Sequence, residues 1–346
     1  MTEPGQLMRS EIEEQPTLLQ GILDHGLDEA RAVADVLRAN PPRFVLLAGR
    51  GTSDHACLYA KYLVEIGLGL PAGMMSPSTL TTYSSRPDLR DVLVVVVSQS
   101  GGSPDLLETA TVAQQCGARV LAVTNNAGSA LAAVADHHLD VLAGDELAVA
   151  ATKSYTAELL TLWLTIDAWR GGDAAAARGV PQAAATLVSR RTSMVELAAR
   201  FRFADRIVLT ARGYSYPTAL EAALKLMETS YVAAHAFSGA DLLHGPLAMI
   251  DESHPVLAVI PEGAGAAAMQ PVLERLQQRG ADLTVIGGPS SVSSGRPGVL
   301  LDHALSEDVS PIADIVALQQ LACEMAIARG FDPDQPRGLS KVTETW

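Results

Sequence analysis

Short apolar runs, each followed by a turn of small polar residues, recur along this chain. The run at residues 92–97 (VLVVVV) is apolar without interruption, which is typical of a parallel strand buried on both faces. Residues 98–105 (SQSGGSPD) follow it directly, and a helix is predicted behind them through residue 115. This part of the chain is therefore predicted to form a strand, a turn rich in hydroxyl groups, and a helix.

The same order of elements occurs twice. Residues 114–118 (QQCGA) recur as residues 277–281 (QQRGA). Strands that alternate with helical segments favour parallel sheets with helices on both faces. The predicted fold class is α/β, with two similar doubly wound parallel-sheet domains in tandem. The strands predicted in the two copies lie at residues 44–47, 92–97 and 120–124 and at residues 207–210, 256–260 and 283–287.

Domain limits follow from this duplication. A helical segment is predicted over residues 1–39, before a first domain over residues 40–175 that carries the hydroxyl-rich turn. A Gly/Ala-rich linker leads to a second domain over residues 185–330, and residues 331–346 form a C-terminal tail. Each domain has an ordinary size and is long enough to bury its own core.

The hydroxyl-rich turn is a candidate anion site. Backbone N–H groups and the dipole at a helix start favour an anion, and the side chains of residues 98–103 add neutral donors. We expect a pocket for a phosphomonoester here, assisted by the turn at residues 51–53. A connecting loop without a ligand is the alternative. In the second copy, residues 261–264 (PEGA) bring a proline and a glutamate, so that copy is not expected to hold phosphate in the same way.

A predicted helix that starts near Pro217 is a second candidate for chemistry. Its residues Glu221, Lys225 and Glu228 are spaced by four and three, which places them along one helical face. From spacing alone, a surface ladder of ion pairs is the commoner outcome. His244 precedes a Gly-Pro pair in a predicted turn, where an imidazole can exchange protons with a ligand.

Composition excludes several classes of function. The chain has 346 residues, of which 48% are hydrophobic, as in globular proteins. Its net charge of −14 argues against a nucleic-acid partner, which would need a basic face. The three cysteines have no paired spacing, which favours a reducing cytoplasm and argues against a metal site built from thiols. Neither a signal peptide nor an apolar stretch that approaches the length of a membrane span is expected.

Several separate motifs, in the same order, resemble the isomerase half of glucosamine-6-phosphate synthase. That half belongs to the tandem sugar isomerase (SIS) family, and the resemblance covers nearly the whole chain. The motifs are MRSEIEEQP at residues 8–16, GTS at 51–53, the turn at 98–103, VAATK at 149–153, RGYSYP at 212–217, the helix with Glu221, Lys225 and Glu228, HGPLA at 244–248 and PRGLSK at 336–341.

The resemblance implies a role for each matching residue. Glu228 would move a proton between C1 and C2 of the sugar, and His244 would open the ring from the neighbouring subunit of a homodimer with shared active sites. Lys225 would position or polarise the substrate. Lys341, on a tail that closes the active site, would meet the open-chain sugar and is a candidate for an imine. No cofactor or metal is implied. The residues implied to bind the sugar phosphate are Gly51, Thr52, Ser53, Ser98, Gln99, Ser100, Ser103, Val149 and Ser340.

The direction of the reaction is inferred from what differs from the synthase. The synthase has an N-terminal glutaminase domain, for which the residues before position 40 leave no room, so glutamine-dependent synthesis by this chain alone is not expected. The SGGSPD turn and the ending LSKVTET look more like stand-alone deaminases, which convert glucosamine 6-phosphate to fructose 6-phosphate and ammonia.

Two departures leave the sugar open. Arg50 and His235 stand where the synthase usually has other residues. A deaminase or deglycase for another 6-phosphosugar, such as galactosamine 6-phosphate or a fructosyl-amine phosphate, and a sugar-phosphate sensor without catalysis remain alternatives. The sequence does not determine the epimer, the N-substituent or the physiological direction.

Overall fold

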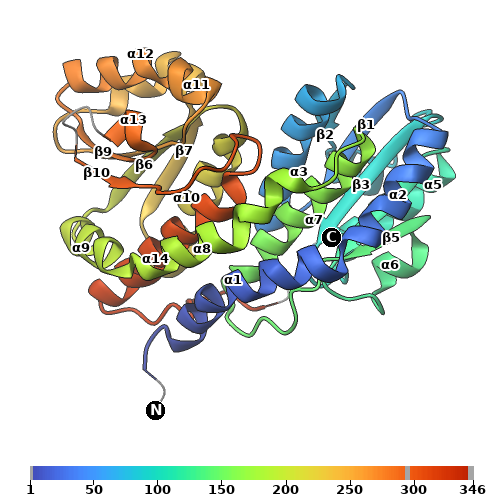
Figure 1. The fold of residues 1–346 in the computed structure, drawn as a ribbon, viewed down its shortest axis with the longest axis horizontal. Coiled ribbons are helices and arrows are strands. Elements are labelled where there is room, and N and C mark those ends of the chain that lie inside the picture. The colour runs from blue at the N-terminus through green and yellow to red at the C-terminus, as the bar shows by residue number, and fades with distance from the viewer. Residues whose placement is uncertain (1–2, 293–296, 342–346) are drawn as a thin grey trace. The chain divides into compact units, whose positions relative to one another are not determined.

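The computed structural model describes residues 3–292 and 297–341 (Figure 1). In this part of the chain, two five-stranded sheets have all their strands parallel, with helices on both faces. The predicted α/β class with two similar sheets in tandem is therefore confirmed. The end of the C-terminal motif, residues 342–345, lies outside the described residues.

The first sheet has the strand order β2-β1-β3-β4-β5. Its predicted strands at residues 44–47, 92–97 and 120–124 all form, with ends within one residue of those expected. The bounds are β1 Phe44–Ala48, β2 Ala72–Met74, β3 Val92–Ser98, β4 Arg119–Thr124 and β5 His137–Asp140. The helices of this part of the chain are α2 Leu27–Ala39, α3 Thr52–Leu63, the π-helix η1 Val64–Leu68, α4 Pro77–Thr81, α5 Pro104–Gln115, α6 Ala130–Val134, α7 Lys153–Trp169 and the 3₁₀ helix η2 Ala175–Gly179.

The second sheet repeats this order as β10-β9-β8-β6-β7. The three strands predicted for the second copy form here too. The bounds are β6 Arg206–Ala211, β7 Ala233–Ser238, β8 Pro255–Ile260, β9 Asp282–Gly287 and β10 Gly298–Leu300. The helices are α8 Val180–Ser189, α9 Arg191–Phe201, η3 Gly213–Ser215, α10 Tyr216–Ser230, α11 Gly239–Leu243, η4 Pro246–Met249, α12 Ala264–Gln278, α13 Pro289–Val292 and α14 Pro311–Ala328. Helix α1 (Gln6–His25) precedes both sheets in the chain.

The chain divides into two compact units that do not follow chain order strictly. One unit contains residues 1–16, 147–152 and 179–339, with the second sheet. The other contains residues 17–146, 153–178 and 340–346, with the first sheet. The domain limits predicted from the sequence stay predictions.

Each sheet has one point where the strand order reverses. In the first sheet β1 lies beside β3, with Ala48 opposite Val96, and in the second sheet β6 lies beside β8, with Thr210 opposite Ala258. The turns that leave the carboxyl ends of two such strands lie next to each other. In open parallel sheets, ligands bind in the crevice at this switch point. The turn at residues 51–53 and the turn at residues 98–103 both leave the switch point of the first sheet.

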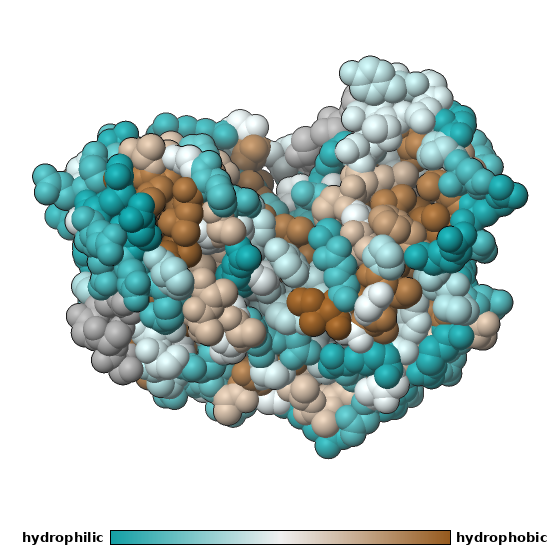
Figure 2. Space-filling model, turned by 90° about the horizontal axis from the view of Figure 1, so that it is seen from above, coloured by the Kyte–Doolittle hydropathy of each residue, from teal (hydrophilic) through white to brown (hydrophobic). Residues whose placement is uncertain are grey.

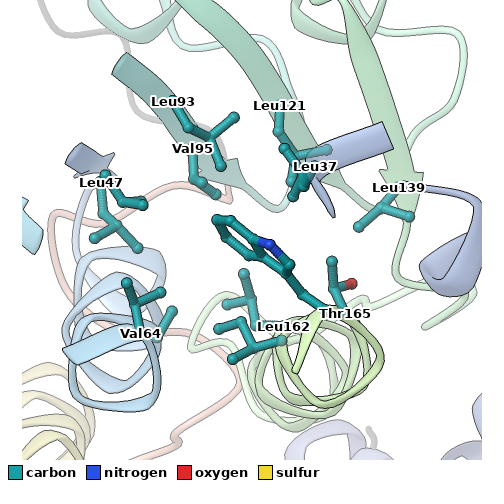
Figure 3. A pocket seen from close by; sticks show the side chains of 13 residues that line it. Leu37, Leu47, Val64, Leu93, Val95, Leu121, Leu139, Leu162 and Thr165 are labelled. Atoms are coloured by element: carbon teal, nitrogen blue, oxygen red, sulfur yellow. The ribbon is translucent and has the colours of Figure 1, made fainter. Parts of the chain in front are cut away.

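Strand β3 carries an uninterrupted apolar run because both faces of this strand are buried. Val94 and Val96 pack in one core cluster with Leu106 of α5. Leu93 and Val95 point to the other face of the sheet, where they border α2 and α7 (Figure 3). Alternate side chains of one strand therefore fill two separate cores.

A small cavity lies in the second of these cores. It has a volume of about 20 Å³ and is lined by apolar side chains with Thr165, among them Leu37, Val64, Leu121 and Leu162 (Figure 3). A water molecule needs two or more polar partners, which this lining does not offer. The cavity is a packing defect of the core and not a ligand site.

The surface drawn in Figure 2 is largely hydrophilic, with apolar patches between the polar side chains. Helix α14, in contrast, is 18 residues long and apolar enough to cross a membrane by length and composition. The expectation that no apolar stretch would approach this length was therefore wrong. In the structure 89% of that window is buried, which is typical of a core helix.

Candidate functional site

The turn after β3 presents hydroxyl groups at the start of a helix. Ser103 is the N-cap of α5, and Pro104 is its first residue, where a missing N–H costs nothing. Ser98 Oγ accepts a hydrogen bond from the Gly101 N–H, and Ser100 Oγ accepts one from the Gly102 N–H, each at 3.2 Å. Because these two oxygens accept within the turn, their own protons remain available for an anion.

Gly101 makes this turn possible. Its φ of +62° is unfavourable for residues with a side chain, and a Cβ here would overlap the side chain of Ser129. Ser129 in turn caps α6 by accepting from the Ala132 N–H. The turn is thus packed tightly against the next helical segment, and its shape does not depend on a ligand.

The turn after β1 lies beside it at the switch point. Gly51 has a φ of +54° and precedes Thr52, the first residue of α3. Ser53 donates its hydroxyl proton to Oε1 of Glu158 in α7 at 2.8 Å, and both side chains are buried. In the structure Ser53 fixes the turn against α7, and direct binding of a sugar by Gly51, Thr52 or Ser53 stays a prediction.

Arg50 forms a contact at the switch point that sequence reasoning missed. Its Nε and Nη2 atoms lie 2.7 and 2.6 Å from Oδ2 of Asp105, a buried carboxylate in the first turn of α5. The pair links the turn after β1 to the helix after β3. Because Asp105 compensates the guanidinium charge, the donors of the turn remain the neutral hydroxyl and N–H groups.

Helix α10 carries the second group of predicted residues. Nζ of Lys225 lies 2.6 Å from Oε2 of Glu228 and 3.3 Å from Oε1 of Glu221. The side chains of Lys225 and Glu221 are 1% and 0% exposed, whereas that of Glu228 is 21% exposed. The alternative of a surface ion-pair ladder is therefore wrong for Glu221 and Lys225.

The charges of this cluster support one another. Burial acts to lower the pKa of Lys225, but the neighbouring charges of Glu221 and Glu228 outweigh it and raise that pKa above its ordinary value. Lys225 is therefore an ammonium ion throughout the neutral pH range. Its contact with Glu228 orients that partly exposed side chain, and the role of Glu228 as a base stays a prediction.

His244 lies in a turn, as predicted. It follows α11 directly, its backbone N–H donates to the carbonyl of Asp241 at 3.0 Å, and its side chain is exposed. Gly245, with a φ of +141°, reverses the chain behind it. A role for His244 in a neighbouring subunit's site stays a prediction.

The segment that contains Val149 is fastened by side chains that the sequence did not single out. The buried carboxylate of Glu11 accepts from the N–H groups of Leu147 and Ala148. The Gln319 amide donates to the Thr152 carbonyl at 3.0 Å. Val149 itself is half-buried between these two attachment points. The resemblance to the family includes the motif that contains Glu11, but nothing in that motif indicates this contact.

The tail brings Lys341 to a buried acid. Nζ of Lys341 lies 2.9 Å from Oε2 of Glu146, whose side chain is fully buried. Ser340 precedes it on the same tail. The part of the predicted site in one unit thus consists of the two turns and the tail, whereas α10, His244 and Val149 belong to the other unit.

Comparison with known proteins decides the family. The model of the SIS domain matches residues 41–168 and 200–329, one match for each sheet. The chain belongs to the SIS domain family. The two turns of the first SIS domain and helix α10 of the second are therefore parts of a tandem SIS protein.

Curated relatives share this tandem. The chain is 32% identical over 351 residues to the isomerizing glutamine–fructose-6-phosphate aminotransferase of Methanothermobacter thermautotrophicus, covering 99% of this chain and 58% of that protein. It is 34% identical over 346 residues to the enzyme of the same name from Thermococcus kodakarensis, covering 96% of this chain and 57% of that protein. The chain thus spans somewhat more than half the length of these relatives.

Solved structures agree on the fold. A candidate phosphosugar isomerase from Silicibacter pomeroyi is 35% identical with a TM-score of 0.84, over 94% of this chain and 99% of that one. The glucosamine-6-phosphate deaminase of Thermotoga maritima superimposes with a TM-score of 0.74 over 98% of this chain and 100% of that one. Its identity is only 21%, so this likeness shows the fold alone.

The second SIS domain fills its own anion position. The carboxylate of Glu307 accepts from the N–H groups of Ala264 and Gly265, at 2.7 and 2.8 Å, at the start of α12. Glu262 accepts hydrogen bonds from the N–H and hydroxyl of Ser290, and the expectation that it repels an anion stays a prediction. A carboxylate of the protein therefore occupies the helix start that corresponds to the hydroxyl-rich turn of the first SIS domain.

Proposed function

We propose that this chain is an amino-sugar-phosphate deaminase/isomerase that converts glucosamine 6-phosphate and water to fructose 6-phosphate and ammonia. The observation that carries the proposal is the buried cluster on α10. Glu221 and Lys225 are withdrawn from solvent and paired at 3.3 Å, and Nζ of Lys225 also lies 2.6 Å from Oε2 of Glu228, whose side chain is partly exposed. A buried ion pair is on balance no more stabilising than well-packed apolar side chains, so stability alone gives no reason for this arrangement.

The proposed chemistry needs one base that serves two adjacent carbons. In the open-chain aldose, Glu228 takes the proton from C2 while the carbonyl oxygen O1 takes up a proton from solvent, which leaves an enolamine with a hydroxyl on C1 and a double bond between C1 and C2. The same carboxylic acid returns a proton to C1, which gives a protonated imine at C2. Water adds to C2, the nitrogen leaves as ammonia, and fructose 6-phosphate remains. No oxidant or reductant is required.

The phosphate would bind at the turn of residues 98–103. Its support is the switch-point position, the free donor capacity of Ser98 and Ser100, and the start of α5. Gln99 and Ser103 would add donors from the same turn. A fixed phosphate anchors the far end of the sugar, so that C1 and C2 occupy one place in every turnover.

The similarities support the substrate class. The curated relatives carry fructose 6-phosphate in their names, and the solved structures include a candidate phosphosugar isomerase. We propose that four further residues complete the site in a homodimer, as the resemblance implies: His244, Lys341, Val149 and Ser340. Arg50, which stands where the synthase usually has another residue, forms an ion pair with Asp105 in this turn. It favours, as a second candidate, deamination or deglycation of another 6-phosphosugar.

A substrate panel tests this proposal. Purified full-length protein is incubated with glucosamine 6-phosphate, galactosamine 6-phosphate, a fructosyl-amine 6-phosphate and fructose 6-phosphate with ammonium. Ammonia and ketose phosphate are measured separately. We expect ammonia from glucosamine 6-phosphate in a one-to-one ratio with fructose 6-phosphate. Release from another sugar only would select the second candidate, and binding without turnover would indicate a sensor.

A further inference from the structure

Glu146 is a fully buried acid at the meeting point of two segments far apart in sequence. It comes after β5 and before the segment with Val149, and its side chain is 0% exposed. It was not among the residues that sequence or resemblance pointed to. Within the same compact unit, it contacts the start of α7 and the C-terminal tail.

One carboxylate serves both segments. Oε1 of Glu146 accepts from the backbone N–H of Ser154 at 3.0 Å, and Oε2 accepts from the Ser154 hydroxyl at 2.7 Å. Ser154 lies in the first turn of α7, where a negative charge is favourable. The second oxygen, Oε2, also accepts from Nζ of Lys341 at 2.9 Å.

The charge of Glu146 is explained by Lys341. Burial acts to raise the pKa of Glu146, but the charge and hydrogen bond of Lys341, with the two hydrogen bonds from Ser154, outweigh it and lower that pKa. A neutral amide or hydroxyl could cap the helix start equally well. A fully buried carboxylate is favourable only where a cation compensates it.

We propose that Glu146 is a positioning residue for Lys341: through the ion pair it holds the lysine side chain at the start of α7 until substrate arrives. The part of this inference that concerns catalysis rests on the proposed function. The part that concerns the lysine itself does not, because the pair exists without a substrate.

The chain offers a matched reference for this pair. Lys61 lies in the same unit, its side chain is 26% exposed against 27% for Lys341, and it forms an ion pair of 2.8 Å with Glu65. Glu65, unlike Glu146, is 35% exposed. Exposed pairs are weak and exchange with water, whereas a pair with a buried acid is not screened in this way. The two lysines match in exposure and in ion-pair distance and differ in the burial of the partner acid; Lys61 also lies 5.6 Å from the centre of the Tyr62 ring.

Competitive acetylation tests the proposal. The full-length protein is treated with trace acetic anhydride at pH 8, and the labelling of Lys341 and Lys61 is quantified by mass spectrometry. In the wild type we expect Lys341 to react at least fivefold more slowly than Lys61. In Glu146→Gln we expect the rate at Lys341 to rise to within twofold of Lys61, because the amide no longer forms the ion pair that holds Nζ against the buried carboxylate.

The control variant is Ser154→Ala, which removes a hydrogen bond to Glu146 but leaves its charge. We expect the slow labelling of Lys341 to persist in this variant. Equal labelling of Lys341 and Lys61 in the wild type would overturn the proposal, even if Glu146→Gln fails to fold. Unchanged slow labelling in a folded Glu146→Gln would overturn it as well.

A second readout joins the pair to catalysis. On whichever 6-phosphosugar is turned over, Glu146→Gln should lower kcat at least tenfold and change KM less than threefold, with Ser154→Ala within threefold of wild type in both. A folded Glu146→Gln with wild-type kcat would refute the catalytic part. Absence of turnover by the wild type would refute the proposed function instead, and the acetylation result would stand independently.

Discussion

Replacing Lys225 by Met is expected to destabilise the fold strongly. The change removes the ammonium from between Glu221, which is fully buried, and Glu228, at 2.6 Å. Met fills a similar volume, so the packing is kept while Glu221 loses the cation beside it. Removing one partner of a buried pair costs about 3–5 kcal/mol, and we expect a loss of that size in the free energy of unfolding.

The matched control is Lys61→Met. Lys61 and Glu65 form a pair with the same i,i+4 spacing at 2.8 Å, but both side chains are partly exposed. Exposed helical pairs contribute about 0.5 kcal/mol or less, so this variant should unfold close to the wild type. Urea unfolding followed by circular dichroism measures both variants under the same conditions.

Two further results test the explanation. The double variant Lys225→Met with Glu221→Met replaces the buried pair by apolar side chains and should recover at least half of the loss. In the wild type, the pKa of Lys225 is raised in the folded state. The contribution of the Lys225 charge to the free energy of unfolding is therefore complete below the ordinary lysine pKa of 10.5 and is lost only as the pH rises through the raised pKa. A loss below about 1 kcal/mol in Lys225→Met would refute the account of a compensated buried charge.

Three further predictions concern other parts of the chain. Replacing Ser98 and Ser100 together by Ala should weaken binding of a 6-phosphosugar by about 3 kcal/mol, and unchanged affinity in calorimetry would exclude this turn as the phosphate site. Glu307→Gln should lower the free energy of unfolding by about 1–2 kcal/mol in urea, since the carboxylate holds two N–H groups at a helix start; an unchanged midpoint would contradict this. Subunits with Glu228→Gln and subunits with His244→Ala should each be inactive, and mixing them should restore ammonia release once mass spectrometry has shown that subunits exchange. A monomer in solution would refute the shared site.

What the sequence could predict was local or repetitive. The run at 92–97 predicts β3 because a strand buried on both faces needs apolar residues at every position, and the recurring QQxGA segments predict the second sheet. The spacing of Glu221, Lys225 and Glu228 predicts a common helical face, but the depth at which that face is buried depends on packing. From the helical spacing alone, a ladder of ion pairs on the protein surface remained the commoner outcome.

What the sequence could not predict depends on contacts between distant residues. Arg50 and Asp105 are 55 positions apart, and Glu146 and Lys341 are 195 positions apart. No periodicity in the sequence connects such distant pairs. Nor does the sequence show that Glu307 binds the N–H groups at the start of α12 whereas Glu262 binds Ser290. Helix α14 shows the converse: its composition suits a membrane span, and only its burial identifies it as a core helix.

The proposed role of Glu228 is to transfer a proton during deamination of an amino sugar phosphate. Its most direct test is to incubate glucosamine 6-phosphate with the protein in D₂O and follow the product by NMR. We expect one ammonia for each fructose 6-phosphate, and deuterium from solvent at C1 of that product. In Glu228→Gln, both products should form at least a hundredfold more slowly. Turnover in Glu228→Gln within about threefold of the wild type, or no product from the wild-type protein, would contradict it.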